Sequence, residues 1–282
     1  CQLEASTHVY FIKFFLFHLF LFPIFAVMTY QELWQRLIPL YEEREAQAII
    51  RMVLDAQFGI TLTDIYTGKV NELSREDVAE LDKIMLRLER SEPVQYVLGR
   101  EVFCGRAFHV APGVLIPRPE TEELCRWIEA DYNHPYCALQ PPVPLRVLDV
   151  GTGSGCIAVT LALDLYNSAV TAWDISADAL LIARENMHQW GAHVELIMED
   201  VLHLSATAEQ LKFDIIVSNP PYICDKERTD MAENVLKYEP ETALFVPDDD
   251  PLRFYRAIAE YGEKALYSGG TLYFETNPLY ID

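Results

Sequence analysis

The chain has 282 residues, of which 51% are hydrophobic and 12% aromatic, so it is long enough to bury a large core in one or two domains. Its 43 acidic and 22 basic residues give a formal net charge of −21. This charge argues against a dedicated nucleic-acid binder, because phosphate contacts need clustered Lys and Arg. The six cysteines are scattered and no histidine pair has the spacing of a helical zinc motif. We therefore expect a cytoplasmic protein with reduced thiols and no metal site.

The N-terminal segment is unusually apolar. Residues 9–27 are almost wholly hydrophobic, and this length would suit a membrane anchor. Met28, however, is followed by Thr29-Tyr30-Gln31-Glu32, which has the form of a capping box at the start of a helix. We therefore expect residues 1–27 to be a translated upstream stretch outside the working protein, with a genuine membrane anchor as the alternative.

The next segment, residues 28–91, has the pattern of a small helical bundle. Apolar residues recur at helical spacing over 33–41 and 49–54, and Gly59 is a suitable stop. A second capping signature at residues 74–77 opens a further helix. We expect this domain to pack and to dock the substrate without taking part in the chemistry.

Residues 92–118 change character and indicate a β-hairpin linker. Gly99, Gly105 and Gly113 punctuate two short runs of β type, residues 94–97 and 107–110. Pro119 then begins a helix whose first turn is acidic, as the helix dipole favours. We expect the last domain to occupy residues 119–282.

From Leu145 onward, strands and helices alternate, which predicts βαβ units and therefore a doubly wound, Rossmann-like parallel sheet of the α/β class. The expected strands cover residues 145–150, 169–174, 193–197, 213–218 and 271–275, and the expected helices start near residue 155 and cover 177–189 and 251–266.

A glycine-rich turn follows the first of these strands. Residues 147–155 read Val-Leu-Asp-Val-Gly-Thr-Gly-Ser-Gly, and the missing Cβ atoms let the backbone approach a ligand and let the helix pack on the strand. Asp174 ends the next strand, where a carboxylate can accept both ribose hydroxyl hydrogens. Asp200, after the third strand, could accept from an adenine amino group. The turn therefore predicts a nucleoside site, with a purely structural turn as the alternative.

The residues expected to bind a nucleoside-containing cofactor at this turn are Gly151, Thr152, Gly153, Gly155, Asp174 and Asp200. The glycines are spaced G-x-G-x-G and no phosphate-binding lysine follows. This spacing disfavours NAD and a P-loop.

The strongest signal is Asn219-Pro220-Pro221-Tyr222, directly after the buried run at 213–218. Proline has no N–H and a locked φ, so the pair ends the strand and fixes the backbone. Asn219 is thereby held at the carboxyl end of a strand, where open α/β sheets bind ligands. Its side-chain amide and the following aromatic ring would suit a planar amino group or amide nitrogen. A simple strand-end cap is the alternative interpretation.

These motifs resemble those of the class I S-adenosylmethionine-dependent methyltransferases. More closely, the chain resembles the HemK/PrmC-type peptide chain release factor N5-glutamine methyltransferases, from Met28 to near its end. Besides the glycine turn and the Asn-Pro-Pro-Tyr tetrad, the resemblance rests on three stretches, residues 93–99, 115–122 and 238–244. The tetrad alone is shared with adenine-N6 DNA and some RNA methyltransferases. Residues 117–122, Pro-Arg-Pro-Glu-Thr-Glu, are much more particular to the release-factor enzymes.

The resemblance implies a function in translation termination. The expected reaction is transfer of a methyl group from S-adenosylmethionine to the side-chain nitrogen (N5) of the glutamine in the Gly-Gly-Gln motif of class 1 peptide chain release factors. Asn219 Oδ1 and the Pro220 carbonyl would each accept one amide hydrogen, and Tyr222 would pack against the amide plane. Pro221 completes the expected substrate site, and Asn219 also borders the cofactor.

The expected partner is a release factor, without direct nucleic-acid contact, and we expect a monomer. Two alternatives stay open. One is an adenine-N6 DNA or RNA methyltransferase, which the charge disfavours. The other is a catalytically impaired module that retains S-adenosylmethionine binding and is tethered to a membrane if residues 9–27 are an anchor.

Two features depart from the family pattern. Family members usually follow the fifth strand with a helix and a final antiparallel strand pair, whereas here residues 274–280 almost end the chain. We therefore expect this C-terminal strand pair to be missing and an apolar sheet edge to be exposed. In addition, Asp248-Asp249-Asp250-Pro251 replaces a stretch that is normally glycine-bearing, and we expect this to affect only a loop.

Overall fold

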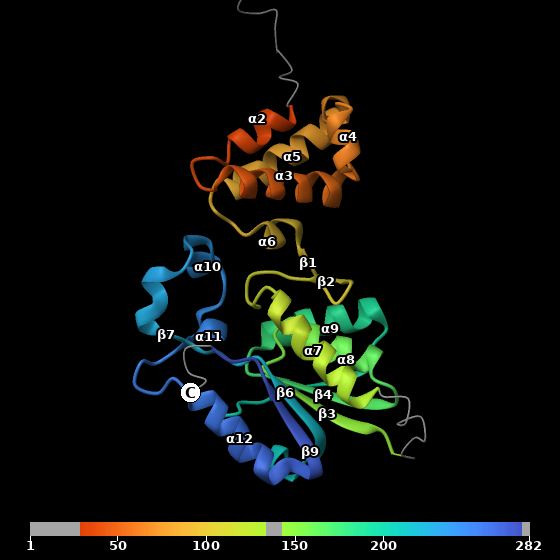
Figure 1. The fold of residues 1–282 in the computed structure, drawn as a ribbon, viewed down its shortest axis with the longest axis vertical. Coiled ribbons are helices and arrows are strands. Elements are labelled where there is room, and N and C mark those ends of the chain that lie inside the picture. Colours follow the sequence, from red (N-terminus) through yellow and green to blue (C-terminus); the bar gives the residue numbers. More distant parts are fainter. Residues whose placement is uncertain (1–28, 134–142, 278–282) are drawn as a thin grey trace, which may run out of the picture. The chain divides into compact units, whose positions relative to one another are not determined.

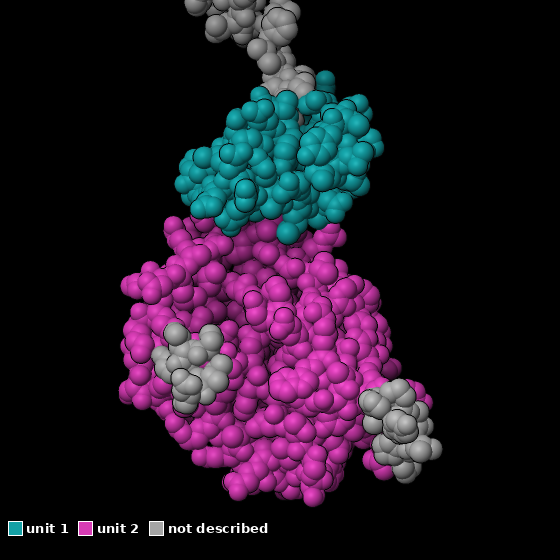
Figure 2. Space-filling view, in the orientation of Figure 1, with its two compact units in different colours: residues 1–85 teal, residues 86–282 magenta. Residues whose placement is uncertain are grey.

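The computed structural model describes residues 29–133 and 143–277. The chain divides into two compact units, residues 1–85 and 86–282 (Figure 2). The expectations for residues 1–27 and for a final strand pair lie outside the described residues. Within the described ranges, no helix is both long and apolar enough to cross a membrane.

The first unit is helical, as predicted, and two of the expected signals hold. The helix expected through residue 41 is shorter, because it ends at Gln35 and residues 36–40 form turns. Thr29 Oγ1 accepts from the backbone of Glu32, and Glu32 Oε2 accepts from Thr29 N at 2.8 Å. Gly59 ends the second helix with φ 65°. The elements are α2 (Tyr30–Gln35), α3 (Glu43–Phe58), α4 (Leu62–Tyr66), the 3-10 turn η1 (Lys69–Glu72) and α5 (Arg75–Leu88), which continues into the second unit.

The predicted hairpin linker is partly wrong. Residues 94–97 were expected to form a strand, but they lie in a one-turn helix, α6 (Val94–Leu98), which begins after Pro93 and ends at Gly99 with φ 69°. A short apolar run does not distinguish a strand from a buried helical turn, and the flanking Pro and Gly decide it here. The hairpin itself comes later, between β1 (Arg100–Phe103) and β2 (Arg106–His109).

The second unit contains a five-stranded parallel sheet in the order β5-β4-β3-β6-β9, which confirms the predicted α/β class. Its helices cover both faces, with α7, α8 and α9 on one side and α12 on the other (Figure 1). The elements are α7 (Pro119–Tyr132), β3 (Leu145–Val150), α8 (Cys156–Asp164), β4 (Ser168–Asp174), α9 (Ala177–Trp190), β5 (Val194–Met198), η3 (Ala208–Gln210), β6 (Phe213–Ser218), α12 (Arg253–Ala265) and β9 (Leu266–Phe274).

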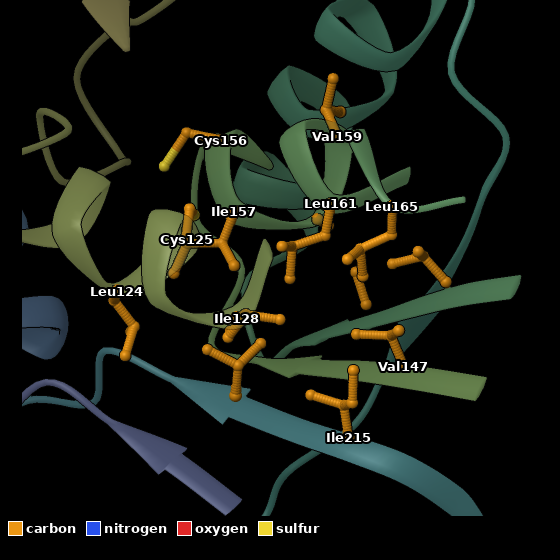
Figure 3. Close-up of a cluster of buried hydrophobic side chains, with 14 of the residues drawn as sticks. Leu124, Cys125, Ile128, Val147, Cys156, Ile157, Val159, Leu161, Leu165 and Ile215 are labelled. Carbon is orange, nitrogen blue, oxygen red and sulfur yellow. The ribbon is translucent and has the colours of Figure 1, made fainter. Parts of the chain in front are cut away.

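Alternate residues of each strand enter different cores, as the pleat of a sheet requires. Val147 and Ile215 pack with α7 and α8 (Figure 3). Leu148 and Ile216 point to the other face and pack with α12. Burial on both faces explains why these strands read as continuous apolar runs in the sequence.

An insertion of short elements follows β6 and precedes α12. It pairs β7 (Ile223–Cys224) with β8 (Phe245–Val246) in parallel. The Asp248-Asp249-Asp250 stretch forms a turn after β8, as expected. Between the two short strands lie η4 (Asp225–Asp230), α10 (Glu233–Tyr238) and α11 (Glu241–Leu244).

Candidate active site

The glycine turn and Asn219 lie side by side because β3 and β6 are paired in register. Val150, the last residue of β3, faces Ser218, the last residue of β6. The Ser218 hydroxyl donates to the Val150 carbonyl at 2.7 Å. Gly151 and Asn219 follow these two residues directly, so both motifs begin at the same carboxyl edge of the sheet, where open α/β sheets bind ligands.

The three glycines of the turn differ in the space around them. Gly151 and Gly153 have φ of 76° and 54°, and a Cβ atom added to either would meet no atom within 4 Å. Gly155 is buried, and an added Cβ would lie 3.0 Å from the Cβ of Ala183 in α9. The structure therefore places Gly155 at the contact between the turn and α9, and leaves Gly151 and Gly153 with open space beside them.

Asp174 lies at the carboxyl end of β4 and holds the same turn. Its Oδ2 accepts from Gly153 N at 2.8 Å, and its Oδ1 accepts from Ser176 N at 2.9 Å. Burial raises the pKa of this carboxyl, although both backbone N–H groups favour its charged form. Asp174 is thus rigidly placed next to the open part of the glycine turn.

Asp200 lies beyond the end of β5. Its two oxygens accept from Leu202 N at 2.9 Å and contact His203 Nδ1 at 2.8 Å. Burial opposes the charged form, but these hydrogen bonds outweigh it and lower the pKa of Asp200. The carboxyl is therefore ionised at neutral pH and its oxygens remain acceptors.

Asn219 is held by a residue of α7. Its Nδ2 donates to Thr121 Oγ1 at 3.1 Å, and Thr121 Oγ1 donates in turn to Glu275 Oε2 at 2.6 Å. Among the described residues no donor reaches Asn219 Oδ1. The Tyr222 hydroxyl also donates to Glu275, at 3.1 Å to Oε1. Burial, followed by the neighbouring carboxylate of Glu275, raises the pKa of Tyr222, so its hydroxyl stays protonated.

The other distinctive segments meet in a buried ion pair. The Glu239 side chain is 1% exposed, and its carboxylate accepts from Arg118 Nη2 at 2.6 Å and from Ile116 N at 3.1 Å. Arg118 belongs to the Pro-Arg-Pro-Glu-Thr-Glu segment and Glu239 to the stretch at 238–240. The contact therefore ties the start of α7 to the insertion that follows Tyr222.

Comparison with known proteins identifies the family. The methyltransferase small domain model matches residues 138–243, and the PrmC N-terminal domain model matches residues 31–99. The release factor glutamine methyltransferase of Bacteroides thetaiotaomicron is 48% identical over 246 residues, which cover 87% of this chain and 85% of that protein. This chain belongs to the release factor glutamine methyltransferase family. The Flavobacterium psychrophilum member is 39% identical over 243 residues, which cover 86% of this chain and 83% of that protein.

One buried polar residue next to the glycine turn was not among the residues expected from the sequence. Asp149 is completely buried, and its Oδ2 accepts from the Thr152 hydroxyl at 2.6 Å. Its Oδ1 has no partner among the described residues. Burial raises the pKa of Asp149 to about 7. In the sequence, Asp149 is one position of an otherwise apolar strand. The one signal that could have identified it is the presence of an acidic residue in such a strand.

Two exposed apolar side chains also lie at this edge of the sheet. Ile175 directly follows β4 and is 59% exposed, and Met198 ends β5 and is 66% exposed. Met198 is paired with Asp174 in the parallel register and Ile175 follows Asp174 in the chain, so both residues are neighbours of Asp174. Together with the open turn, this surface fits a ligand that has a flat apolar ring and a hydroxylated part, as S-adenosylmethionine does.

The site does not coincide with the cavity at the other end of the strands. That cavity has a volume of about 670 Å³ and includes Arg146, Thr171, His188 and Glu195 in its lining. It opens at the amino ends of β3 and β4, whereas ligands of open α/β sheets bind at the carboxyl ends. Within residues 29–133 and 143–277, no cluster of three His, Cys, Asp or Glu side chains is arranged to hold a metal ion.

Proposed function

We propose that this chain transfers a methyl group from S-adenosylmethionine to the N5 nitrogen of the glutamine in the Gly-Gly-Gln motif of class 1 peptide chain release factors. The observation that carries the proposal is the pairing of Val150 with Ser218. It sets the glycine turn beside Asn219, so a bound methyl donor and a bound amide would meet at one edge of the sheet.

The cofactor would be held by Gly151, Thr152 and Gly153 at the turn and by Asp174 at its ribose. Asp200 and the apolar pair Ile175 and Met198 would hold the adenine ring. Gly155 acts on this site indirectly, through the packing of α9. When bound, S-adenosylmethionine supplies an electrophilic methyl group, and the chain must then bring a weak nucleophile into line with it.

An amide nitrogen is a poor nucleophile because its lone pair is delocalised into the carbonyl. Asn219 Oδ1 and the Pro220 carbonyl would accept the two amide hydrogens and so fix the nitrogen while leaving electron density on it. Pro221 and the ring of Tyr222 would confine the amide plane. Positioning of this kind can lower a barrier by ~7–11 kcal/mol when the geometry is ideal.

No side chain in this arrangement is needed as a strong base. The raised pKa of Tyr222 keeps its hydroxyl protonated near neutral pH, so this residue does not accept the proton. The amide nitrogen becomes far more acidic once it is methylated, and the proton can pass to water after the transfer. The helical domain expected over residues 28–91 would dock the substrate, and we propose that the chain acts as a cytoplasmic monomer.

Adenine-N6 methylation uses the same kind of grip on an amino nitrogen and is the competing function. The net charge of −21 disfavours it, because nucleic-acid phosphates are bound by clustered basic residues. The Arg118–Glu239 pair joins two of the segments on which the resemblance to the release-factor enzymes rests, and this agrees with the release-factor reaction.

A methyl-transfer assay tests the proposal. Tritiated S-adenosylmethionine would be incubated with the chain and with a release factor, with its Gln→Ala loop variant, or with duplex DNA. We expect label in the unmodified release factor alone. Label that enters DNA but not the release factor would overturn the proposal, and equal labelling of the loop variant would place the methyl group on another residue.

A further inference from the structure

Glu275 lies directly after β9, and its carboxylate accepts hydrogen bonds from two hydroxyl groups. Its Oε2 accepts from Thr121 Oγ1 at 2.6 Å and its Oε1 accepts from the Tyr222 hydroxyl at 3.1 Å. Its backbone is also fixed, because Glu275 N donates to the Ser218 carbonyl at 3.1 Å and the Glu275 carbonyl accepts from Tyr255 at 3.0 Å. The carboxylate is therefore anchored beside the end of β6, where Asn219 follows.

The chemistry of these groups sets the direction of each hydrogen bond. A carboxylate can only accept, so the single hydroxyl hydrogen of Thr121 must point at Glu275. Thr121 Oγ1 then has only lone pairs to offer to Asn219, and the group that faces it must be the donor Nδ2. A flipped amide would set Asn219 Oδ1 against an oxygen that has no hydrogen to give.

From this we infer that Glu275 and Thr121 form a relay that fixes the amide of Asn219 with Oδ1 toward the substrate, and that the relay selects glutamine over glutamate. The inference rests on the proposed function. A fixed Oδ1 is an acceptor and favours a substrate group that carries hydrogens. A flipped Asn219 would present Nδ2 instead and would favour a carboxylate. Glu275 and Thr121 are thus positioning residues.

Two substitutions at Thr121 give a matched comparison. Thr121→Val keeps the shape of the side chain and removes the hydroxyl, whereas Thr121→Ser keeps the hydroxyl. We expect Thr121→Val to lower kcat by ~10- to 100-fold, as small displacements of a reacting partner do, with unchanged affinity for S-adenosylmethionine. Thr121→Ser should restore most of the rate. Thr160→Val is the control, because this buried hydroxyl in α8 has no partner among the described residues.

The decisive measurement is the binding preference between a release factor and its Gln→Glu loop variant, by calorimetry. The unmodified chain should prefer the glutamine form, and Thr121→Val should narrow that preference by ~10-fold or more, the effect of one misdirected hydrogen bond. Glu275→Leu should also narrow the preference for the glutamine form. Without the carboxylate, the Thr121 hydroxyl could donate its hydrogen to Asn219, and either orientation of the amide would then be allowed. A preference that Thr121→Val leaves unchanged would overturn the relay, as would equal impairment by Thr121→Ser.

A measurement without substrate separates this inference from the proposed function. In chains carrying ¹⁵N-labelled asparagine, the Nδ2 hydrogen of Asn219 that is bonded to Thr121 should exchange slowly, and Thr121→Val should speed its exchange. Equal exchange in both chains would refute the relay whatever the substrate is. Failure of the unmodified chain to bind or methylate any release factor, with the exchange difference intact, would refute the proposed function and leave the relay standing.

Discussion

Asn219 and Asp174 both lie at carboxyl ends of strands, but they face different parts of the expected reaction. Asn219 presents an acceptor next to the turn, and Asp174 is bonded to the turn itself. Removing one should therefore impair the chemistry, and removing the other should impair cofactor binding. This separation can be measured residue by residue.

For Asn219→Ala we expect the methyl-transfer rate to fall at least ~100-fold, because the amide loses one of its two acceptors and its alignment. The affinity for S-adenosylmethionine, measured by calorimetry, should stay close to that of the unmodified chain. A parallel loss of cofactor affinity would show that Asn219 serves the cofactor and not the substrate.

For Asp174→Ala we expect the affinity for S-adenosylmethionine to fall by ~10- to 100-fold, the effect of losing charge-assisted hydrogen bonds worth about 1.5–3 kcal/mol. Calorimetry of the two chains measures it directly. Unchanged affinity would refute the ribose role of this carboxylate. Asp178→Ala, an exposed position in the first turn of α9, is the control.

Asp149 should make stability depend on pH. Burial raises its pKa from 3.8 to about 7 in the folded chain, so the folded state holds a proton that the unfolded state releases. Stability from this group is present below about pH 4 and is lost as the pH rises to about 7. Relative to Asp149→Asn, the unmodified chain should lose up to about 4 kcal/mol over this window, as denaturant unfolding at several pH values would show. An equal pH dependence in both chains would mean that Asp149 is ionised when folded.

At the scale of elements, the close contact between the glycine turn and α9 can be tested by adding a side-chain carbon at Gly155. Gly155→Ala would force a Cβ to 3.0 Å from the Ala183 side chain at φ 79°. We expect the free energy of unfolding to fall by about 2–4 kcal/mol, from overpacking and backbone strain together.

Gly191→Ala at the end of α9 is the matched variant for this measurement. It has φ 65° and nothing within 4 Å of an added Cβ. It should lower the free energy of unfolding by only about 1–2 kcal/mol, since backbone strain acts there alone. Equal losses in the two variants would mean that α9 shifts easily and that the close contact is unimportant.

The elements also show where sequence patterns suffice. The parallel strands were predictable because burial on both faces leaves long apolar runs, and the capping boxes and Gly59 set helix ends locally. The strand expected at residues 94–97 was wrong because so short a run fits either structure. The strands β7 and β8 have only two residues each, which is too short for a pattern of alternating apolar and polar residues, so they could not be predicted from the sequence.

Some residues of the candidate site could be predicted from the sequence and others could not. Asn219 and the glycine turn belong to compact motifs and could be found from the sequence. The relay could not, because Thr121 lies 98 positions from Asn219 and 154 positions from Glu275 along the chain. Only the order of strands, with β6 next to β9, brings Glu275 to Asn219. Asp149 is a buried acidic residue within an apolar strand, and the sequence offers no signal for it beyond that polarity.

At the scale of the whole molecule, the PrmC N-terminal domain model covers residues 31–99, which include the described helices of the first unit, and the methyltransferase small domain model covers residues 138–243 of the second unit. The strong acidity of the chain favours a protein substrate over a nucleic acid, since it opposes phosphate binding. The proposed function therefore requires that the release factor reach the carboxyl edge of the sheet, where Asn219 lies.

Mass spectrometry of a methylated release factor tests the central claim most directly. The chain, S-adenosylmethionine and a release factor from cells that lack this modification would be incubated together, and the peptide with the Gly-Gly-Gln motif would be sequenced by fragmentation. We predict the added mass of one methyl group on the glutamine side chain, and none when the chain carries Asn219→Ala. An unmodified glutamine, with S-adenosylmethionine bound and the chain folded, would contradict the proposed function.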